Sequence, residues 1–338
     1  MDVKRSSARS LEPYEATPKR NITALKVPPF RFHRVALNAM LTCIALAVNT
    51  TCTQAKEDPT ATASLPMYEV SESVKKADDI FWSHLQAKLK SEGISGPVSL
   101  ARTSGELIDQ WEQPDLLLSQ ACGYPYVHTL MDKGVKIVGT PIYATNSNLP
   151  AGEYRSVIVV NSATPYKTLA DLKGKRAGVN DWTSNSGMNL FRAAVAETFP
   201  EDVLRQGVFS SVTVTDGHLK SVRMIAADQI DVASIDDVSY DLIRRNYPDL
   251  ASKTRILAVT PAAPGLPMIT STQTDDATLQ MMRTAIKDLV EHPDDEALRE
   301  ALATMKLTGF AVIDKQEYVD RVHQLEDLAR NKGYPTLK

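Results

Sequence analysis

The sequence predicts an α/β protein of two lobes, each a mostly parallel sheet flanked by helices, joined to each other by two crossover segments. With 338 residues and 43% apolar content, the chain is long enough for two ordinary globular lobes. Strand-like apolar segments alternate with amphipathic helical segments, as they do in parallel sheets covered by helices. We expect the first lobe at 65–156, the second lobe at 157–258, and a return to the first lobe with C-terminal helices at 259–338.

The first 55 residues have the pattern of an export leader. Basic residues precede an apolar run at 35–48, which is shorter than the ~20 residues of a membrane-spanning helix and fits a signal peptide, whose apolar region needs roughly 7–15. Cleavage after Ala55 satisfies the small-residue rule. Cys52 offers a lipid anchor as an alternative, although the three residues before it are not those of a lipoprotein cleavage site. We expect a periplasmic or other extracytoplasmic protein with a linker at 56–64.

Charge and cysteine content narrow the function further. The net charge is −3, and residues 1–34 contribute +5 from eight Lys/Arg and three acids, so the rest of the chain carries −8. An acidic body argues against a nucleic-acid partner. The only cysteines are Cys43, Cys52 and Cys122, which allow at most one disulfide. No cofactor or metal motif is present, and we expect a monomer without a cofactor.

The expected elements of the first lobe follow from apolar periodicity. A short strand at 65–68 precedes a helix that starts at Ser71 and buries positions at helical spacing up to Leu89. The remaining expected elements are a strand at 98–102, a helix at 105–112, strands at 115–119, 136–139 and 154–160, and a helix at 125–133.

The second lobe repeats the alternation, and the chain then ends in helices. The expected strands are at 176–180, 208–215, 231–235 and 255–260, and the expected helices at 168–174, 218–228 and 238–247. A proline-rich segment at 261–267 returns the chain to the first lobe. Helices follow at 275–291, 294–305 and 315–332, without long strands between them.

The most informative stretch is the polar turn at 180–192, between a strand and an amphipathic helix. Ser184, Asn185, Ser186 and Gly187 precede apolar positions that repeat at helical spacing. The first N–H groups of a helix lack internal partners and carry partial positive charge, so this turn suits an oxyanion. The alternative is an ordinary helix cap.

Four more candidate ligand-binding residues lie where strands end. Ligands of open α/β sheets bind beyond the carboxyl ends of strands, and there the sequence places Tyr68, Tyr124, His218 and Asp236. Each has a simpler explanation: half-buried aromatic rings, a surface histidine, or a helix cap. Ser186, His218 and Asp236 could also form a hydrolase triad, but no nucleophile-elbow, P-loop, zinc-protease or dinucleotide-binding motif occurs. We therefore expect no catalytic residues.

Several segments, in this order, resemble the periplasmic substrate-binding proteins of phosphonate/phosphate-type ABC transporters, in the wider group with sulfonate-binding and transferrin-like proteins. They are Asp115-Leu-Leu-Leu-Ser-Gln-Ala-Cys-Gly-Tyr-Pro125, Leu169-Ala-Asp-Leu-Lys-Gly-Lys-Arg-Ala-Gly-Val-Asn-Asp181, Ser184-Asn-Ser-Gly-Met188, Gly217-His218, Asp231-Val-Ala-Ser-Ile-Asp236 and Thr260-Pro-Ala-Ala-Pro-Gly-Leu-Pro267. The resemblance covers roughly residues 63–270. It implies a type II periplasmic binding fold whose lobes close over a ligand.

The resemblance also implies roles. The turn at 184–187 would hold the anion, His218 would reach an anionic oxygen, Asp236 would meet a hydroxyl, ammonium or protonated oxygen, and Tyr68 and Tyr124 would face the ligand. The partner would be an ABC permease. Asp216 and Asp237 depart from the family pattern by adding negative charge, which leaves room for a zwitterionic or neutral ligand besides a phosphonate or phosphate. A sensor that reports to a membrane kinase is the other open function.

Overall fold

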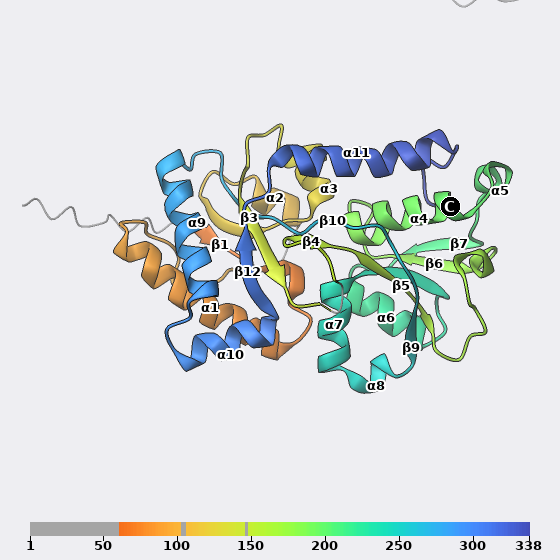
Figure 1. The fold of residues 1–338 in the computed structure, drawn as a ribbon, viewed down its shortest axis with the longest axis horizontal. Coiled ribbons are helices and arrows are strands. Elements are labelled where there is room, and N and C mark those ends of the chain that lie inside the picture. The colour runs from red at the N-terminus through yellow and green to blue at the C-terminus, as the bar shows by residue number, and fades with distance from the viewer. Residues whose placement is uncertain (1–60, 103–105, 146–147) are drawn as a thin grey trace, which may run out of the picture. The chain divides into compact units, whose positions relative to one another are not determined.

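The computed structural model describes residues 61–102, 106–145 and 148–338 (Figure 1). The predicted signal segment, the cleavage point at Ala55, the lipid-anchor candidate Cys52 and most of the linker lie outside the described residues. Within the described part of the chain, no helix combines the length and the apolar character that a membrane span needs.

The first lobe is built on a five-stranded mixed sheet. β1 runs parallel to β2, whereas β11 runs antiparallel to both of its neighbours and β12 antiparallel to β3. The strands in spatial order are β1 (Thr62–Ala63), β2 (Leu116–Gln120), β11 (Met268–Thr270), β3 (Lys136–Tyr143) and β12 (Leu307–Ala311).

Helices cover this sheet and form the core of the first lobe. α1 begins where the Ser71 hydroxyl accepts a hydrogen bond from the Val74 N–H, and it buries residues such as Phe81 and Leu85 at helical spacing against α9 and α10. The helical elements are η1 (Pro66–Tyr68), α1 (Glu72–Ser91), α2 (Leu107–Trp111), α3 (Gly123–Pro125), η2 (Tyr126–Leu130), α9 (Asp276–Glu291) and α10 (Glu296–Met305).

The second lobe has its own five-stranded sheet. β7, β6 and β8 are parallel, and β5 lies antiparallel between β8 and β9. Its strands in spatial order are β7 (Ser211–Val214), β6 (Arg176–Val179), β8 (Val232–Asp236), β5 (Ser156–Asn161) and β9 (Thr254–Val259). Its helical elements are η3 (Leu169–Leu172), η4 (Asn185–Asn189), α4 (Leu190–Thr198), α5 (Glu201–Gln206), α6 (His218–Ala226), α7 (Asp237–Asn246) and α8 (Pro248–Ala251).

Two segments that connect the lobes lie side by side. β4 (Glu153–Tyr154) leads into β5, β10 (Ala263–Pro264) leads back toward β11, and the two pair antiparallel. The Gly265 N–H extends the pairing by donating to the Gly152 carbonyl at 2.7 Å. Both strands that follow a crossover, β5 and β11, run antiparallel to the two strands beside them.

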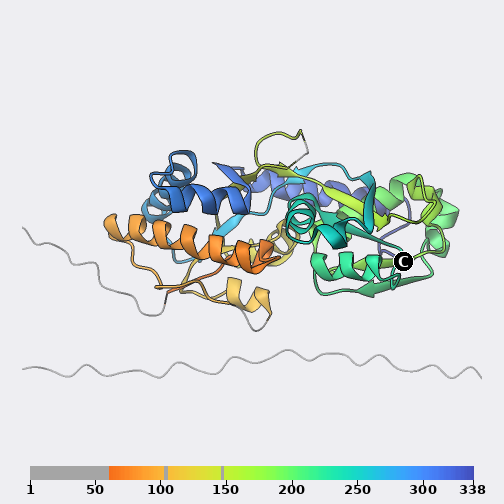
Figure 2. The same ribbon diagram turned by 90° about the horizontal axis from the view of Figure 1, so that it is seen from below.

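The last helix also joins the lobes. α11 (Lys315–Asn331) runs along one side of the described chain in Figure 1, from the first sheet to α4 of the second. In Figure 2, which is seen from below, α1 lies nearer to the viewer than α11. Tyr318 belongs to a core cluster of the first lobe, whereas Ala329, Tyr334 and Leu337 belong to the core of the second. The sequence led us to expect C-terminal helices that return to the first lobe, and α11 with the residues after it contributes to the cores of both lobes.

Three expectations need correction. Residues 65–68 form the 3-10 turn η1 instead of a strand, because Pro66 has no N–H for a sheet ladder. The strand is β1, so residues 62–64 of the expected linker belong to the fold. No strand forms at 98–102; the Ala101 N–H donates to the Ala63 carbonyl of β1, but the segment does not continue this pairing as a strand. β12 was missed because a five-residue strand between two helices gives little periodic signal.

Candidate ligand-binding site

Loops from both lobes surround a cavity of about 1010 Å³. The first lobe contributes η1 with the residues after it, part of α2, and the segment around α3. The second lobe contributes the turn before η4, the start of α6 and the end of β8. Six of the eight residues predicted from sequence line this cavity: Tyr68, Tyr124, Ser184, Ser186, His218 and Asp236. The ends of strands therefore do meet at one place.

Ser184 and Ser186 are held rigidly at the start of η4. The Ser184 hydroxyl accepts the Gly187 N–H at 2.9 Å, which makes Ser184 the cap of this turn. The hydroxyls of Ser156 and Ser234, from β5 and β8, donate to the Ser186 carbonyl at 3.0 and 2.8 Å. The sheet thus fixes the turn on which the Ser186 side chain stands.

His218 is the first residue of α6, and the turn before it is strained. Asp216 has φ 60° and Gly217 has φ 149°, both in the region that L-residues rarely adopt. His218 Nε2 lies 3.0 Å from the Ser186 hydroxyl and 3.5 Å from the Asp236 N–H. Since Nε2 accepts from a backbone donor, the proton of the neutral ring is on Nδ1.

Burial keeps this imidazole neutral. Desolvation lowers the pKa of His218 to about 4. The Nδ1 atom is buried and has no hydrogen-bond partner among the described residues. A buried donor without a partner costs roughly 1–3 kcal/mol, so a ligand oxygen that accepted from Nδ1–H would remove that cost.

Asp236 connects the lobes across the cavity. Its Oδ2 accepts a hydrogen bond from the Tyr68 hydroxyl of the first lobe at 3.2 Å, and its Oδ1 accepts the Ser239 N–H at 2.9 Å as the cap of α7. Burial and the neighbouring Asp237 raise the pKa of the Asp236 carboxyl group. A carboxyl group of this kind takes up a proton readily and can then donate to a ligand oxygen.

Asn185 and Gly187 do not line the cavity, and they have structural contacts. The Asn185 amide donates to the Tyr154 hydroxyl of β4 at 3.0 Å, and its N–H donates to the Cys122 sulfur at 3.2 Å. A Cβ at position 187 would lie 1.7 Å from Asn180 Oδ1, so glycine is required there for packing. Their predicted contact with the ligand has no support in these contacts.

Tyr124 lines the cavity, but its hydroxyl donates to a residue that is not on the cavity wall. It bonds Glu326 of α11 at 2.8 Å. Burial, followed by this contact with Glu326, raises the pKa of Tyr124 to about 12. Because the hydroxyl is engaged with Glu326, a ligand in the cavity would contact the ring of Tyr124. Glu326 itself lies beside His128 and His323, the group of described side chains next to the cavity that could hold a metal ion.

Sequence reasoning missed several residues of the cavity wall. Asn180 follows β6, and its buried Oδ1 has no hydrogen-bond partner in the described part of the chain. The rule about strand ends would have identified it. Lys220 and Arg223 lie one turn apart on α6 and supply positive charge, although Lys220 forms an ion pair with Asp216 at 2.7 Å.

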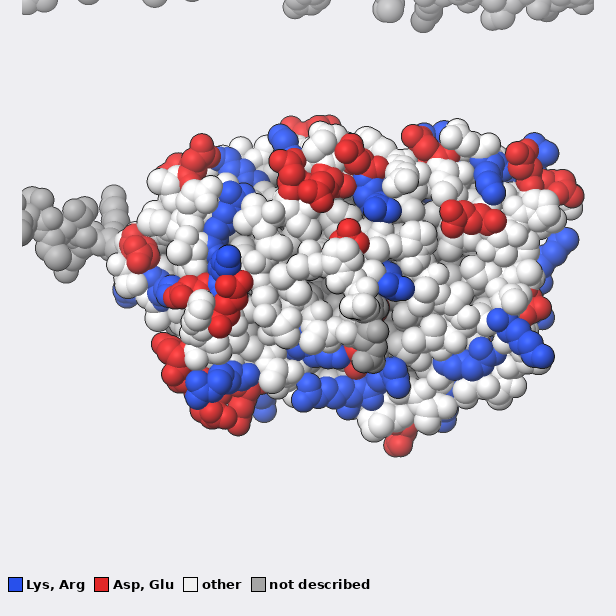
Figure 3. Space-filling view, viewed as in Figure 1, with Lys and Arg blue, Asp and Glu red and all other residues white. Residues whose placement is uncertain are grey.

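Acidic residues outnumber basic residues on the cavity wall. The acids are Glu69, Glu106, Asp181, Asp216 and Asp236, of which Glu69 pairs with Arg102. Over the face drawn in Figure 3, described acidic and basic side chains are likewise interspersed. Charges of both signs thus surround the cavity, and a neutral donor such as the Nδ1–H of His218 has to supply much of any anion binding.

The hydrolase alternative requires His218 to be oriented by a carboxylate at Nδ1. Ser186 and His218 do form the first contact of a triad, at 3.0 Å. The Asp236 carboxylate, however, bonds Tyr68 and Ser239, and Nδ1 is without a partner in the described structure. This geometry does not assemble the Ser-His-Asp relay that the alternative needs.

Comparison with known proteins agrees with the two-lobed architecture. Residues 63–318 match the family described as ABC transporter, phosphonate, periplasmic substrate-binding protein. A curated relative, the phosphonates-binding periplasmic protein of Escherichia coli, is 26% identical over 153 residues, which is 44% of each chain. The match thus spans less than half of that relative.

Solved structures show the same fold at low identity. A binding protein of an ABC phosphonate transporter from Pseudomonas aeruginosa has a TM-score of 0.62 at 16% identity, over 81% of this chain and 87% of its own. PhnD1 from Prochlorococcus marinus, in complex with methylphosphonate, has a TM-score of 0.59 at 14% identity, over 82% and 100%. The fold is that of a type II periplasmic binding protein, and the chain belongs to the family of periplasmic substrate-binding proteins of phosphonate ABC transporters.

Proposed function

We propose that this protein captures a small oxyanion of the phosphonate or phosphate class in the cavity between its lobes and delivers it to an ABC permease. The observation that carries the proposal is the buried Nδ1–H of His218, a residue of the cavity wall: this group lacks a partner in the described structure, while Nε2 of the same ring lies 3.0 Å from the Ser186 hydroxyl. The family match and the methylphosphonate complex of a protein with the same fold support it.

The ligand is small and anionic or zwitterionic. The Nδ1–H of His218 donates to the oxyanion, and the Ser186 hydroxyl donates to Nε2 and so holds the imidazole in this orientation. Tyr68 of the first lobe faces this group and bonds Asp236 across the cavity. The unpartnered Oδ1 of Asn180 accepts from a donor group of the ligand, such as a hydroxyl, an ammonium or a protonated phosphonate oxygen. The excess of acids on the wall favours a ligand that carries such a group over a fully ionised phosphate.

Calorimetric titration tests the binding part. The panel is methylphosphonate, aminoalkylphosphonates, phosphate, a phosphate ester and an alkylsulfonate. We expect at least one phosphonate to bind. His218→Gln should weaken that binding roughly 10- to 150-fold, because a hydrogen bond to a charged group contributes about 1.5–3 kcal/mol. Ser186→Ala should act in the same direction.

The matched controls are His292→Gln and Ser211→Ala, which change exposed residues away from the cavity wall. They should bind like the unchanged protein. If no compound of the panel binds, or if His218→Gln binds as tightly as His292→Gln, the site is not the one proposed.

The transport part is tested by the neighbouring genes. In the proposed role, the exported protein acts as a monomer in the periplasm. Genes for a permease and an ATPase beside this gene would agree with import. A histidine-kinase gene in their place would favour a ligand-binding sensor and contradict the transport role.

A further inference from the structure

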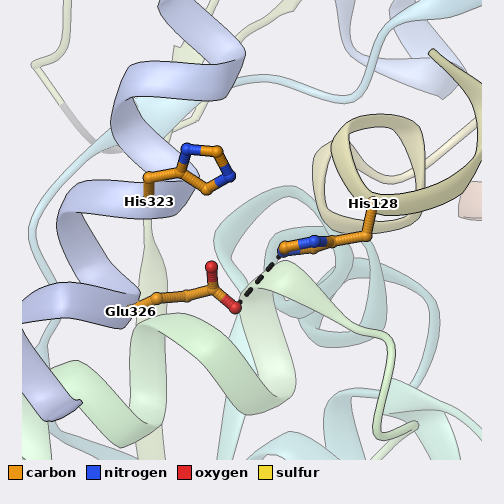
Figure 4. Close-up of side chains that lie close together, drawn as sticks. All are labelled: His128, His323 and Glu326. Atoms are coloured by element: carbon orange, nitrogen blue, oxygen red, sulfur yellow. Dashed lines mark ion pairs between the residues drawn. The ribbon is translucent and has the colours of Figure 1, made fainter. Parts of the chain in front are cut away.

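Two histidines and a glutamate meet beside the cavity, between η2 and α11 (Figure 4). His128 comes from η2, and His323 and Glu326 come from α11. One ligand atom of each residue lies within 4.8 Å of the other two, and His128 Nε2 is 3.2 Å from Glu326 Oε1. Figure 4 shows the three side chains directed into the same space.

We propose that this cluster binds one divalent transition-metal ion of the Zn²⁺ type, through a ring nitrogen of His128, a ring nitrogen of His323 and a carboxylate oxygen of Glu326. Two imidazoles and one carboxylate are a donor set that Zn²⁺ takes in proteins, with water in the fourth position. The site shares His128 with the wall of the oxyanion cavity, whereas His323 and Glu326 lie outside that wall, and the proposal does not depend on the transport function.

The spacing of the ligands suits such an ion. His323 and Glu326 are three residues apart on α11 and therefore lie on the same face of that helix. Zn²⁺ binds nitrogen and oxygen at about 2.0–2.2 Å, which places tetrahedral ligand atoms roughly 3.4 Å apart. His128 Nε2 and Glu326 Oε1 are close to this separation, at 3.2 Å, and the ligand atom of His323 lies within 4.8 Å of both residues' ligand atoms.

The surroundings are those of a metal site with access to solvent. Both histidines are exposed, whereas Glu326 is 8% exposed and thus held in place. Two neighbours orient the Glu326 carboxylate. The Tyr124 hydroxyl donates to it at 2.8 Å, and Arg192 Nη2 lies 3.8 Å from it. Ligating carboxylates are commonly oriented by partners of this kind. Arg192 also offsets part of the negative charge, so we expect micromolar rather than nanomolar affinity.

A second group of described residues provides an internal control. His84, Asp294 and Asp295 also lie close enough to share an ion. Asp295, however, caps α10 through the Leu298 N–H at 2.7 Å, and the group has a single imidazole. Zn²⁺ prefers the cluster with two imidazoles.

The test is titration of the purified, untagged full chain with Zn²⁺, followed by calorimetry and thermal unfolding. We expect one ion to bind at the cluster and to raise Tm. His323→Gln should weaken this binding by at least about 100-fold, since even loss of a residue that only orients a ligand costs roughly 10–100-fold. His84→Gln should leave it unchanged. Co²⁺ should give the visible absorption of a low-coordinate site, which His323→Gln abolishes.

The outcomes are decisive in each direction. Failure of the unchanged protein to bind Zn²⁺ overturns the proposal, as does loss of binding in His84→Gln with retention in His323→Gln. His128→Gln changes a ligand on the other element, so it replaces His323→Gln if that variant does not fold by circular dichroism. Retention of full affinity in a folded His128→Gln protein would likewise reject the site.

Discussion

Asp78 is a buried carboxyl group in α1, on the wall of a small void of about 10 Å³ that Tyr68 and Tyr143 also line. It is 4% exposed, and its Oδ2 has no hydrogen-bond partner among the described residues. Burial raises the pKa of Asp78 to about 8. The folded protein therefore holds a proton on this group at neutral pH, whereas the unfolded chain does not.

This difference makes stability depend on pH. Because the folded pKa is the higher one, Asp78 costs nothing below about pH 4, and the cost grows by roughly 1.4 kcal/mol per pH unit up to about pH 8. Asp78→Asn should raise the free energy of unfolding at pH 8 and have little effect at pH 4. Urea unfolding across this range measures it, with the exposed Asp109→Asn as control. Equal effects at both pH values would contradict the assignment.

At the scale of elements, α11 and the residues after it hold the second lobe. Tyr334 is fully buried, and its hydroxyl donates to the Lys338 carbonyl at 2.7 Å. The Lys338 carbonyl also accepts the Val208 N–H at 2.7 Å. A segment that follows the first lobe in the chain thus completes the core of the other lobe.

Removing that contact should destabilise the protein. Tyr334→Ala deletes a fully buried ring, and we expect a loss of about 3–5 kcal/mol in the free energy of unfolding. Lys332→Ala lies in the same segment outside the core and should change stability by less than about 0.5 kcal/mol. Denaturant titration measures both. A Tyr334→Ala protein as stable as Lys332→Ala would show that this segment does not anchor the second lobe.

At the scale of the whole described chain, contacts other than the crossovers also join the lobes. Lys306 of the first lobe forms an ion pair with Asp241 of α7. The Arg245 guanidinium donates to the Ala303 carbonyl at 3.0 Å, and the Tyr247 hydroxyl donates to the Val70 carbonyl at 2.9 Å. These contacts hold the lobes together in this structure while β4 and β10 form the connection between them.

Loss of the ion pair should make the lobes separate more often. Lys306→Ala removes a part-buried contact that contributes about 1–2 kcal/mol, so amide hydrogen exchange should become roughly 5–30-fold faster at the facing segments, 70–78 and 238–247. Lys287→Ala changes an exposed lysine of α9 and should leave these rates unchanged. If Lys306→Ala exchanges no faster than Lys287→Ala, the ion pair does not restrain the lobes.

The site shows how far sequence could lead. Strand ends followed by polar residues identified Ser186, His218 and Asp236, because the rule depends only on the order of strands and helices. Asn185 and Gly187 stand beside Ser186 in the same turn, and the sequence pattern selected them too. In the structure they pack against Tyr154 and Asn180 instead. Side-chain direction within a turn depends on neighbours distant in sequence, and periodicity does not contain it.

Apolar periodicity and turn residues along the chain were sufficient to predict the α/β class, the two lobes and the strand ends at which the candidate site forms. The tertiary structure decided the reversal of β5 and β11, the path of α11 to the second lobe, and the meeting of His128 with His323 and Glu326. Each of these depends on contacts between segments that are far apart in the sequence, which local patterns do not record.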